Sequence, residues 1–239
     1  DKVLTKKKTD IMNLKTADVN LEAVDTILNN ISKFSPYPNR VKLIAVTKKF
    51  SAQTIINTTN KNIFFIGENQ VQEIKNKISE IEQIKRLKLH FIGHLQSNKA
   101  KDAVKLFDCI QTLDSKKILN KINKESEKIE KIQQGMIQIN ITENPNQFGV
   151  KPQKIEELLS YAKELKNIKI VGLMAMGINS TNSEKKLNTF KKIQSLFIEL
   201  NDKKYGLEEI SIGMSGDYIE ALKCGSTMIR IGTNLYGKR

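Results

Sequence analysis

The spacing of apolar residues predicts one helix followed by a long series of short strands and helices. Leu21, Val24, Leu28 and Ile31 recur at helical spacing, and this helix should end before the SPYP segment at 35–38. Beyond it, short β-branched and apolar runs alternate with longer amphipathic stretches. Eight such runs occur, at 43–48, 63–67, 89–93, 109–113, 136–141, 168–175, 209–213 and 228–232.

Strands that alternate with helices predict a parallel sheet of right-handed βαβ units. The runs contain few polar positions, which is typical of strands covered on both faces. Eight units favour a closed (β/α)8 TIM barrel, with the N-terminal helix as an extra element. An open doubly wound sheet is the main alternative, but no run precedes a G-x-G-x-x-G turn, and GMSG at 213–216 does not match it. No linker or repeat divides the chain, so we expect a single domain over residues 1–239.

Two helix starts can be predicted from local signals. Thr181 and Glu184 have the spacing of a capping box ahead of apolar positions 187, 190, 193, 196, 197 and 200. Pro152 stands where a first helical turn would begin.

Composition excludes several classes of protein. With 39% hydrophobic and 28% charged residues, the chain is typical of globular proteins. No apolar run reaches the roughly 18 residues of a membrane span, and residues 1–14 lack the apolar core of a secretory signal. Two cysteines, Cys109 and Cys224, are too few for a disulfide scaffold, and no Cys/His cluster predicts a metal site. A cytoplasmic location fits these features.

The net charge of +14 raises nucleic acid or an anionic membrane as partners. However, the lysines are scattered among glutamates in helix-like stretches, and only four basic residues are arginines. Aromatic residues make up 6% of the chain, without tryptophan, and supply little for stacking on bases. We therefore expect solvated helix faces, and neither nucleic acid nor membrane as a partner.

In a barrel of this kind the functional residues lie at the carboxyl ends of the strands. The first run ends in Lys48 and Lys49. A lysine partly desolvated in the barrel mouth is nucleophilic toward aldehydes. Strand alternation puts Lys48 on the face of Ile44 and Val46, which suits a barrel interior, so Lys48 is the better candidate. The alternative is a pair of surface lysines.

Two glycine turns and one arginine point to an anionic ligand. Ser215 and Thr233 each follow a glycine at the end of the last two runs, where barrels of this kind commonly bind phosphate. Each turn can also be only a helix cap. Arg230 lies within the apolar segment MIRIG at 228–232 and must meet an acceptor. That acceptor is either a ligand held by the turns or a buried carboxylate such as Glu68.

Other polar side chains end the second and third runs. Asn69 follows the second, while His90 and His94 flank the end of the third. Neither histidine has a partner at metal-ligand spacing, so both are expected to be structural, with no catalytic or metal-binding role. Met174 and Met176 alternate on the sixth run and are predicted to pack in the core.

A lysine, two phosphate turns and a buried arginine match the needs of pyridoxal 5′-phosphate (PLP), which carries an aldehyde, a phosphate and a ring nitrogen. The sequence also closely resembles the pyridoxal phosphate homeostasis protein family, in order over nearly the whole chain. The matching segments are AVTK at 45–48, IGEN at 66–69 with VQE at 71–73, HFIGHLQSNK at 90–99, GLM at 172–174, IGMS at 212–215, and GSTMIRIGT at 225–233 with YG at 236–237.

The resemblance implies a fold and a set of site residues. The family is similar in fold to the alanine racemase barrel, a fold-type III PLP barrel. Lys48 would form the imine with PLP, and Arg230 would face the pyridine nitrogen. The remaining cofactor-binding residues implied are Ser215, Gly232 and Thr233 at the phosphate, with Asn69 and Met214 lining the pocket. The sequence departs from the commonest family pattern at Gln70, Gly216 and Gln147, which leaves open the polarity of the pocket and any accessory role of the 147 loop.

The family is regarded as carrying PLP or regulating its supply, with effects on amino-acid and keto-acid metabolism and without established turnover. An arginine at the ring nitrogen keeps that nitrogen unprotonated, which makes PLP a poor electron sink. Only residues 234–239 follow the last run, so we expect no second domain to supply another acid/base group. A racemase-like enzyme that uses His94, and a Schiff-base aldolase for phosphorylated sugars, are the alternatives. Apo forms of PLP enzymes are candidate recipients, and we expect a monomer, with a weak dimer as the alternative.

Overall fold

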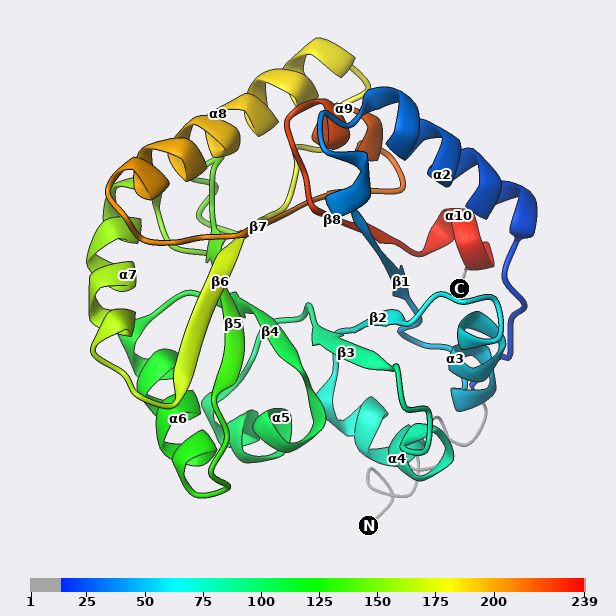
Figure 1. The fold of residues 1–239 in the computed structure, drawn as a ribbon, viewed down its shortest axis with the longest axis horizontal. Helices are drawn as coiled ribbons and strands as arrows, with labels where there is room; N and C mark the ends of the chain where they lie inside the picture. Colours follow the sequence, from blue (N-terminus) through cyan, green and yellow to red (C-terminus); the bar gives the residue numbers. More distant parts are fainter. Residues whose placement is uncertain (1–13, 239) are drawn as a thin grey trace.

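The computed structural model describes residues 14–238, so the prediction about a secretory signal concerns residues that lie almost entirely outside this range. Within it, parallel strands close into a barrel in the order of the sequence (Figure 1). The strands are β1 (Lys42–Val46), β2 (Phe65–Glu68), β3 (Lys88–Phe91), β4 (Cys109–Leu113), β5 (Gln133–Ile139), β6 (Ile168–Ala175), β7 (Glu209–Met214) and β8 (Met228–Ile231). Every predicted run overlaps one of these strands, with boundaries that differ by up to three residues, and the open-sheet alternative is wrong.

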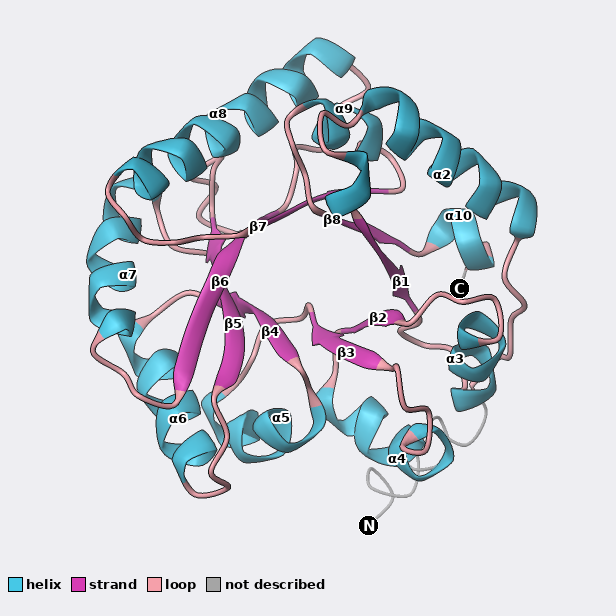
Figure 2. Ribbon diagram, in the orientation of Figure 1, coloured by secondary structure: helices cyan, strands magenta, loops and turns pink. Residues whose placement is uncertain are grey.

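Helices form a ring around the barrel (Figure 2). They are α2 (Leu21–Phe34), α3 (Ala52–Thr59), α4 (Val71–Ile81), α5 (Ala100–Leu106), α6 (Lys116–Glu127), α7 (Ile155–Lys163), α8 (Ser183–Asp202), α9 (Tyr218–Lys223) and α10 (Thr233–Tyr236), with 3₁₀ turns η1 (Pro38–Arg40), η2 (Ser97–Lys99) and η3 (Pro152–Lys154). Pro152 begins the 3₁₀ turn that leads into α7, as predicted. In residues 14–238, no helix combines the length and apolar character of a membrane span.

The extra helix α2 lies against the end of the chain, beside α9 and α10 (Figure 1). The backbone N–H of Asn20 donates to the carbonyl of Leu235 at 2.9 Å, and the Asn30 amide donates to the Tyr218 hydroxyl at 2.7 Å. The helix itself was predicted correctly, but its buried stripe is Val24, Ile27 and Ile31, while Leu21 and Leu28 are about half exposed. A stripe at i, i+3 and i+7 satisfies the helical period as well as the predicted one.

Two further local predictions need correction. The N-cap of α8 is Asn182, whose side chain accepts from the Lys185 N–H at 2.9 Å, so Thr181 is not the cap. Asparagine is as good a cap as threonine or better, which explains the shift of one residue. Strand β1 ends at Val46, so Lys48 lies in a turn and not on the strand.

Apolar side chains fill both sides of the strands. Inside the barrel, Ile44, Met136, Val171, Met174 and Met228 pack with Cys109. A larger cluster lies between the outer side of the strands and the helices, with phenylalanines 50, 91 and 107 among its fully buried members. Covering on both sides explains why the strands read as continuous apolar runs, and it leaves the strand ends as the places for polar chemistry.

Candidate functional site

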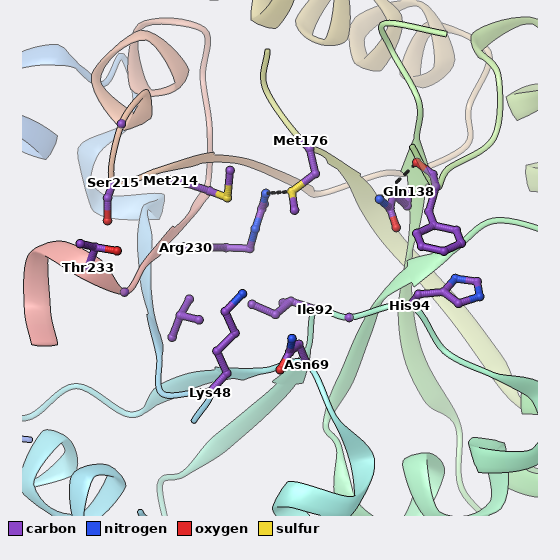
Figure 3. A pocket seen from close by; sticks show the side chains of 15 residues that line it. Lys48, Asn69, Ile92, His94, Gln138, Met176, Met214, Ser215, Arg230 and Thr233 are labelled. Atoms are coloured by element: carbon purple, nitrogen blue, oxygen red, sulfur yellow. Dashed lines mark hydrogen bonds between the residues drawn. The ribbon is translucent and has the colours of Figure 1, made fainter. Parts of the chain in front are cut away.

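The carboxyl ends of the strands surround a cavity of about 450 Å³, a size typical of small-molecule sites (Figure 3). Its lining consists of Val46, Lys48, Asn69, Ile92, Gly93, His94, Gln138, Phe148, Met176, Met214, Ser215, Gly216, Arg230, Gly232 and Thr233. All seven residues predicted to bind a cofactor are in this set. No aspartate or glutamate is among these lining residues, whereas a lysine and an arginine are, so the cavity favours an anionic ligand.

A tight turn presents Lys48 to the cavity. The Phe50 N–H donates to the Thr47 carbonyl at 3.0 Å and closes the turn, and Lys49 adopts the left-handed region with φ of 65°. Lys48 is half-buried and points into the cavity, while Lys49 is exposed (Figure 3). The choice of Lys48 over Lys49 therefore agrees with the geometry, although a turn and not strand alternation produces it.

Behind this turn lies a buried group of polar residues, here called the outer cluster: Thr47, Glu68, Glu73 and Lys77. Lys77 Nζ lies 2.9 Å from Glu68 Oε1 and 2.6 Å from Glu73 Oε1. Burial raises the pKa of Glu68 to about 7, opposed by the charge of Lys77 and reinforced by that of Glu73. Glu68 ends β2, while Glu73 and Lys77 lie on α4 in the outer ring of helices (Figure 2), so the outer cluster joins the end of this strand to that helix.

Arg230 is held from inside the barrel by neutral acceptors. Its Nη1 donates to the carbonyl and hydroxyl of Ser211 at 2.8 and 2.7 Å, and its Nη2 donates to the Ala175 carbonyl at 3.0 Å. Burial lowers the pKa of the guanidinium to about 10, opposed by the charge of Asp217, so Arg230 stays charged at neutral pH. Glu68 instead bonds Thr47 and Lys77, so an Arg230–Glu68 pair is wrong.

The bonds of Arg230 continue through the barrel as the inner chain: Arg230, Ser211, Gln111 and His90. The Ser211 hydroxyl donates to Gln111 Oε1 at 2.6 Å, and Gln111 Nε2 lies 2.9 Å from His90 Nδ1. Burial lowers the pKa of His90 to about 4, so the ring is neutral and its Nδ1 accepts from the amide. His90 is thus a hydrogen-bonded structural residue, as predicted.

The two glycine turns meet at one side of the cavity. The Asn234 N–H donates to the Ser215 hydroxyl at 3.4 Å, and the Met214 N–H donates to the Asp217 carboxylate at 2.6 Å. Gly213 has φ of 98°, and a Cβ there would lie 2.7 Å from Ala221 Cβ, so only glycine fits. Ser215 and Thr233 are therefore neighbours on the same rim (Figure 3).

Asn69 supplies an unsatisfied polar atom at the cavity. Its side-chain oxygen is buried and has no hydrogen-bond partner. A Cβ on Gly93 would lie 2.2 Å from the Asn69 carbonyl oxygen, so this glycine permits the close approach of the two loops. Because an unpaired buried polar atom is unfavourable, a ligand that bonds Asn69 gains affinity.

The far side of the cavity is lined by residues that were not among the predicted cofactor-binding residues. His94, predicted as structural, lies at the rim opposite Ser215 and Thr233 (Figure 3) and stacks on Phe148 with ring centroids 3.8 Å apart. Met176 packs against the barrel interior as predicted, but it also lines the cavity and contacts Arg230. An exposed phenylalanine in the polar segment NPNQFG at 144–149 is the signal that could have identified Phe148.

The three departures from the family pattern lie at different distances from the cavity. Gly216 lines it, and the Gly216 carbonyl accepts from Lys186 Nζ at 2.7 Å. Gln70 is the N-cap position of α4 and does not line the cavity. Gln147 accepts from the Thr142 hydroxyl at 2.9 Å within its own loop.

Comparison with known proteins identifies the family to which the chain belongs. Residues 19–239 match the family described as alanine racemase, N-terminal domain. A "Pyridoxal phosphate homeostasis protein" of Haemophilus influenzae is 36% identical over 204 residues, or 84% of this chain and 86% of the relative. A Synechocystis protein of the same name is also 36% identical, with 84% and 93% covered.

Solved structures give the same result. PipY of Synechococcus elongatus without PLP is 30% identical, with a TM-score of 0.80 over 88% of this chain and all of the other. The PLP-bound form of PipY is 29% identical to this chain, with a TM-score of 0.78 and the same coverage of both chains. Alanine racemase of Clostridium difficile, at 16% identity and a TM-score of 0.74, shares the barrel fold over 95% of this chain and 62% of its own. This chain belongs to the alanine racemase N-terminal domain family and, within it, to the pyridoxal phosphate homeostasis proteins.

Proposed function

We propose that this protein binds PLP through Lys48 and serves to hold and supply the cofactor, without turning over a substrate of its own. The observation that carries the proposal is the single cavity that gathers a lysine, an arginine and two hydroxyl-bearing glycine turns and has no carboxylate in its lining. The PLP-bound structure of a relative and the names of the curated relatives support it.

The residues of the cavity fit PLP. When bound, PLP supplies an aldehyde that condenses with a primary amine. Lys48 provides that amine, and the hydroxyls of Ser215 and Thr233 lie together on one rim, where they suit the phosphate. The orphaned amide oxygen of Asn69 gives a polar group of the ligand a partner. Met214 and Gly232 complete the lining beside the turns.

Arg230 favours a holding role over catalysis. Within residues 14–238, the hydrogen bonds of the guanidinium go to neutral groups of Ser211, Ala175 and Met176, so its positive charge remains available to the cavity. A cation that cannot release its proton at neutral pH disfavours protonation of a nearby pyridine nitrogen. Without that protonation PLP withdraws electrons poorly, and carbanion chemistry at an amine is slow.

The cavity also offers few groups for proton transfer. Among its lining residues only Lys48, His94 and Arg230 are titratable, and His94 is stacked on Phe148 at the rim. Two opposed acid/base groups are needed for racemisation at an α-carbon.

We further propose that release goes to apo-enzymes or free amines, and that the protein acts as a single barrel domain and a monomer. We also propose that it works in the cytoplasm, which suits its two free, buried cysteines.

Visible absorption of the purified protein with added PLP tests the proposal. The wild type and Lys49→Ala should both develop the yellow band of lysine-bound PLP, and Lys48→Ala should lose it. A band that survives in Lys48→Ala but disappears in Lys49→Ala overturns the assignment of the lysine. Incubation of the loaded protein with single-enantiomer amino acids tests the holding role, because inversion far beyond the amount of protein would establish a racemase.

A further inference from the structure

The outer cluster holds a buried lysine between two buried carboxylates. The side chains of Glu68, Glu73 and Lys77 are each at most 7% exposed. Charged groups this deep are unfavourable unless they are paired in good geometry. Lys77 bonds both carboxylates at 2.6 to 2.9 Å, so it fixes the distance between the end of β2, which carries Glu68, and the first turn of α4, which carries Glu73.

The outer cluster forms hydrogen bonds with the Lys48 turn on both sides of Lys48. Before it, the Thr47 hydroxyl donates to Glu68 Oε1 at 2.6 Å. After it, the backbone N–H of Lys49 donates to Glu73 Oε1 at 2.6 Å. The two oxygens that accept these hydrogen bonds are the same ones that Lys77 Nζ contacts, so a single ammonium group links the two carboxylates that hold the turn.

The turn needs such support because its conformation is strained. The backbone of Lys49 has φ of 65°, in the left-handed region that residues other than glycine and asparagine seldom adopt. Strained backbone of this kind persists only where surrounding contacts determine it. The hydrogen bond that Glu73 accepts comes from the backbone N–H of Lys49, the strained residue itself. Lys48 directly precedes Lys49 in the chain.

We propose that Lys77 is a positioning residue for Lys48: by holding Glu68 and Glu73 together, it fixes the turn that directs the Lys48 amine into the cavity. Lys77 is not one of the residues that line the cavity, so it acts through the turn and not on a ligand. The inference rests on the proposed function, in which Lys48 is the residue that bonds PLP.

Lys77→Met tests the proposal, with Lys75→Met as the matched control. Lys75 lies on the same helix but pairs with Asp102 at the surface, with 43% of its side chain exposed. Two measurements are made: hydrogen exchange of the Lys49 backbone amide in the protein without PLP, and the affinity for PLP by visible titration. We expect Lys77→Met to speed exchange at Lys49 and weaken PLP binding, each by about tenfold or more, and Lys75→Met to change neither.

Glu73→Gln removes the negative charge at position 73 but keeps an oxygen that can accept the hydrogen bond from Lys49. This variant also replaces Lys77→Met as the test if loss of the buried cation prevents folding. Its amide oxygen still accepts from the Lys49 N–H but binds Lys77 more weakly, so we expect smaller changes of the same sign. A folded Lys77→Met with wild-type exchange at Lys49 and wild-type affinity overturns the proposal, as does a Glu73→Gln variant unchanged in both. A wild type that gives no PLP band refutes the proposed function instead, and the exchange measurement still decides whether Lys77 fixes the turn.

Discussion

The two cations of the cavity are supported in opposite ways. Lys48 stands on a strained turn braced from outside the barrel by the charged outer cluster. Arg230 stands on strand β8 and is braced from inside by the neutral inner chain. One support consists of ion pairs and the other of dipoles.

The difference suits the chemistry of each group. In the proposed function Lys48 has to be directed into the cavity, and the outer cluster does this through the Thr47 hydroxyl and the Lys49 backbone N–H, on either side of Lys48. Arginine needs its charge undiminished to act on a ligand. Neutral acceptors orient the guanidinium without cancelling its charge, whereas a bonded carboxylate would cancel it.

Removal of Arg230 should have the largest effect, because it disrupts the inner chain and the cavity together. We expect Arg230→Glu to lose about 3 kcal/mol or more of stability, since the Ser211 and Ala175 carbonyls lose their donor and a buried carboxylate gains no partner. Denaturant unfolding measures this loss. In the folded fraction, the spectrum of bound PLP should shift because the ring nitrogen can now protonate.

Arg86→Glu is the matched control for that variant. Arg86 is exposed and lies over the Phe64 ring, away from the cavity lining. Its stability should change by less than about 1 kcal/mol, with an unchanged spectrum. Equal losses in the two variants would mean that the inner chain contributes no support.

The pH dependence of stability should separate the two supports, because their buried titratable groups act with opposite sign. The pKa of Glu68 is raised from 4.5 to about 7, so the folded state holds a proton that the unfolded state releases, and stability falls as pH rises through that window. The pKa of His90 is lowered from 6.5 to about 4, so stability falls as pH drops through that window.

In the wild type these two contributions oppose each other between pH 4.5 and 6.5. Removal of one should expose the other. Relative to wild type, Glu68→Gln should lose stability as pH falls toward 4, and His90→Asn should gain stability as pH falls from 7 to 4.5. Denaturant midpoints measured across this range provide the test, and parallel curves for all three proteins would contradict the opposite signs.

Gln111→Leu should have a smaller effect that is confined to the inner chain. The substitution removes the acceptor of the Ser211 hydroxyl and the donor to His90, which costs about 1–3 kcal/mol in unfolding experiments. Arg230 keeps its carbonyl acceptors, so PLP affinity should fall by less than about tenfold. Exchange at the Lys49 amide should not change, and an increase there would show that the two supports are coupled.

The sequence was sufficient to predict the barrel and seven of the residues that line the cavity, but not the far side of the cavity or the supports. Short, nearly continuous apolar runs located all the strands, because burial on both faces leaves few polar positions in each strand. The motif at 212–215 and the arginine at 230 placed the turns and the buried cation correctly. In contrast, Lys77 lies in a stretch that reads as an ordinary amphipathic helix, and only the folded chain brings it to Glu68.

Some misses have the same origin in three-dimensional packing. Lys48 was assigned by strand alternation, yet β1 stops at Val46 and a turn aims the side chain. A left-handed lysine cannot be anticipated where glycine is the usual choice. Phe148 and His94 come from loops after β5 and β3, so their stacking depends on the closure of the barrel and not on sequence spacing.

The smallest expected effect concerns Lys49 itself and tests whether strain in the turn matters. In Lys49→Gly, relief of the left-handed strain should stabilise the folded state by roughly 1 kcal/mol. The glycine also makes the unfolded chain more flexible, which lowers stability by about the same amount. The free energy of unfolding should therefore change by less than about 0.5 kcal/mol. Lys49→Val instead should lose at least 1 kcal/mol, because a β-branched residue is poorly tolerated at φ of 65°. If both variants match the wild type in unfolding and in amide exchange, the turn is set by Phe50 and the core alone. A loss in the valine variant only, with wild-type PLP binding in the glycine variant, would show that the brace from Glu73, and not the side chain of Lys49, fixes the direction of Lys48.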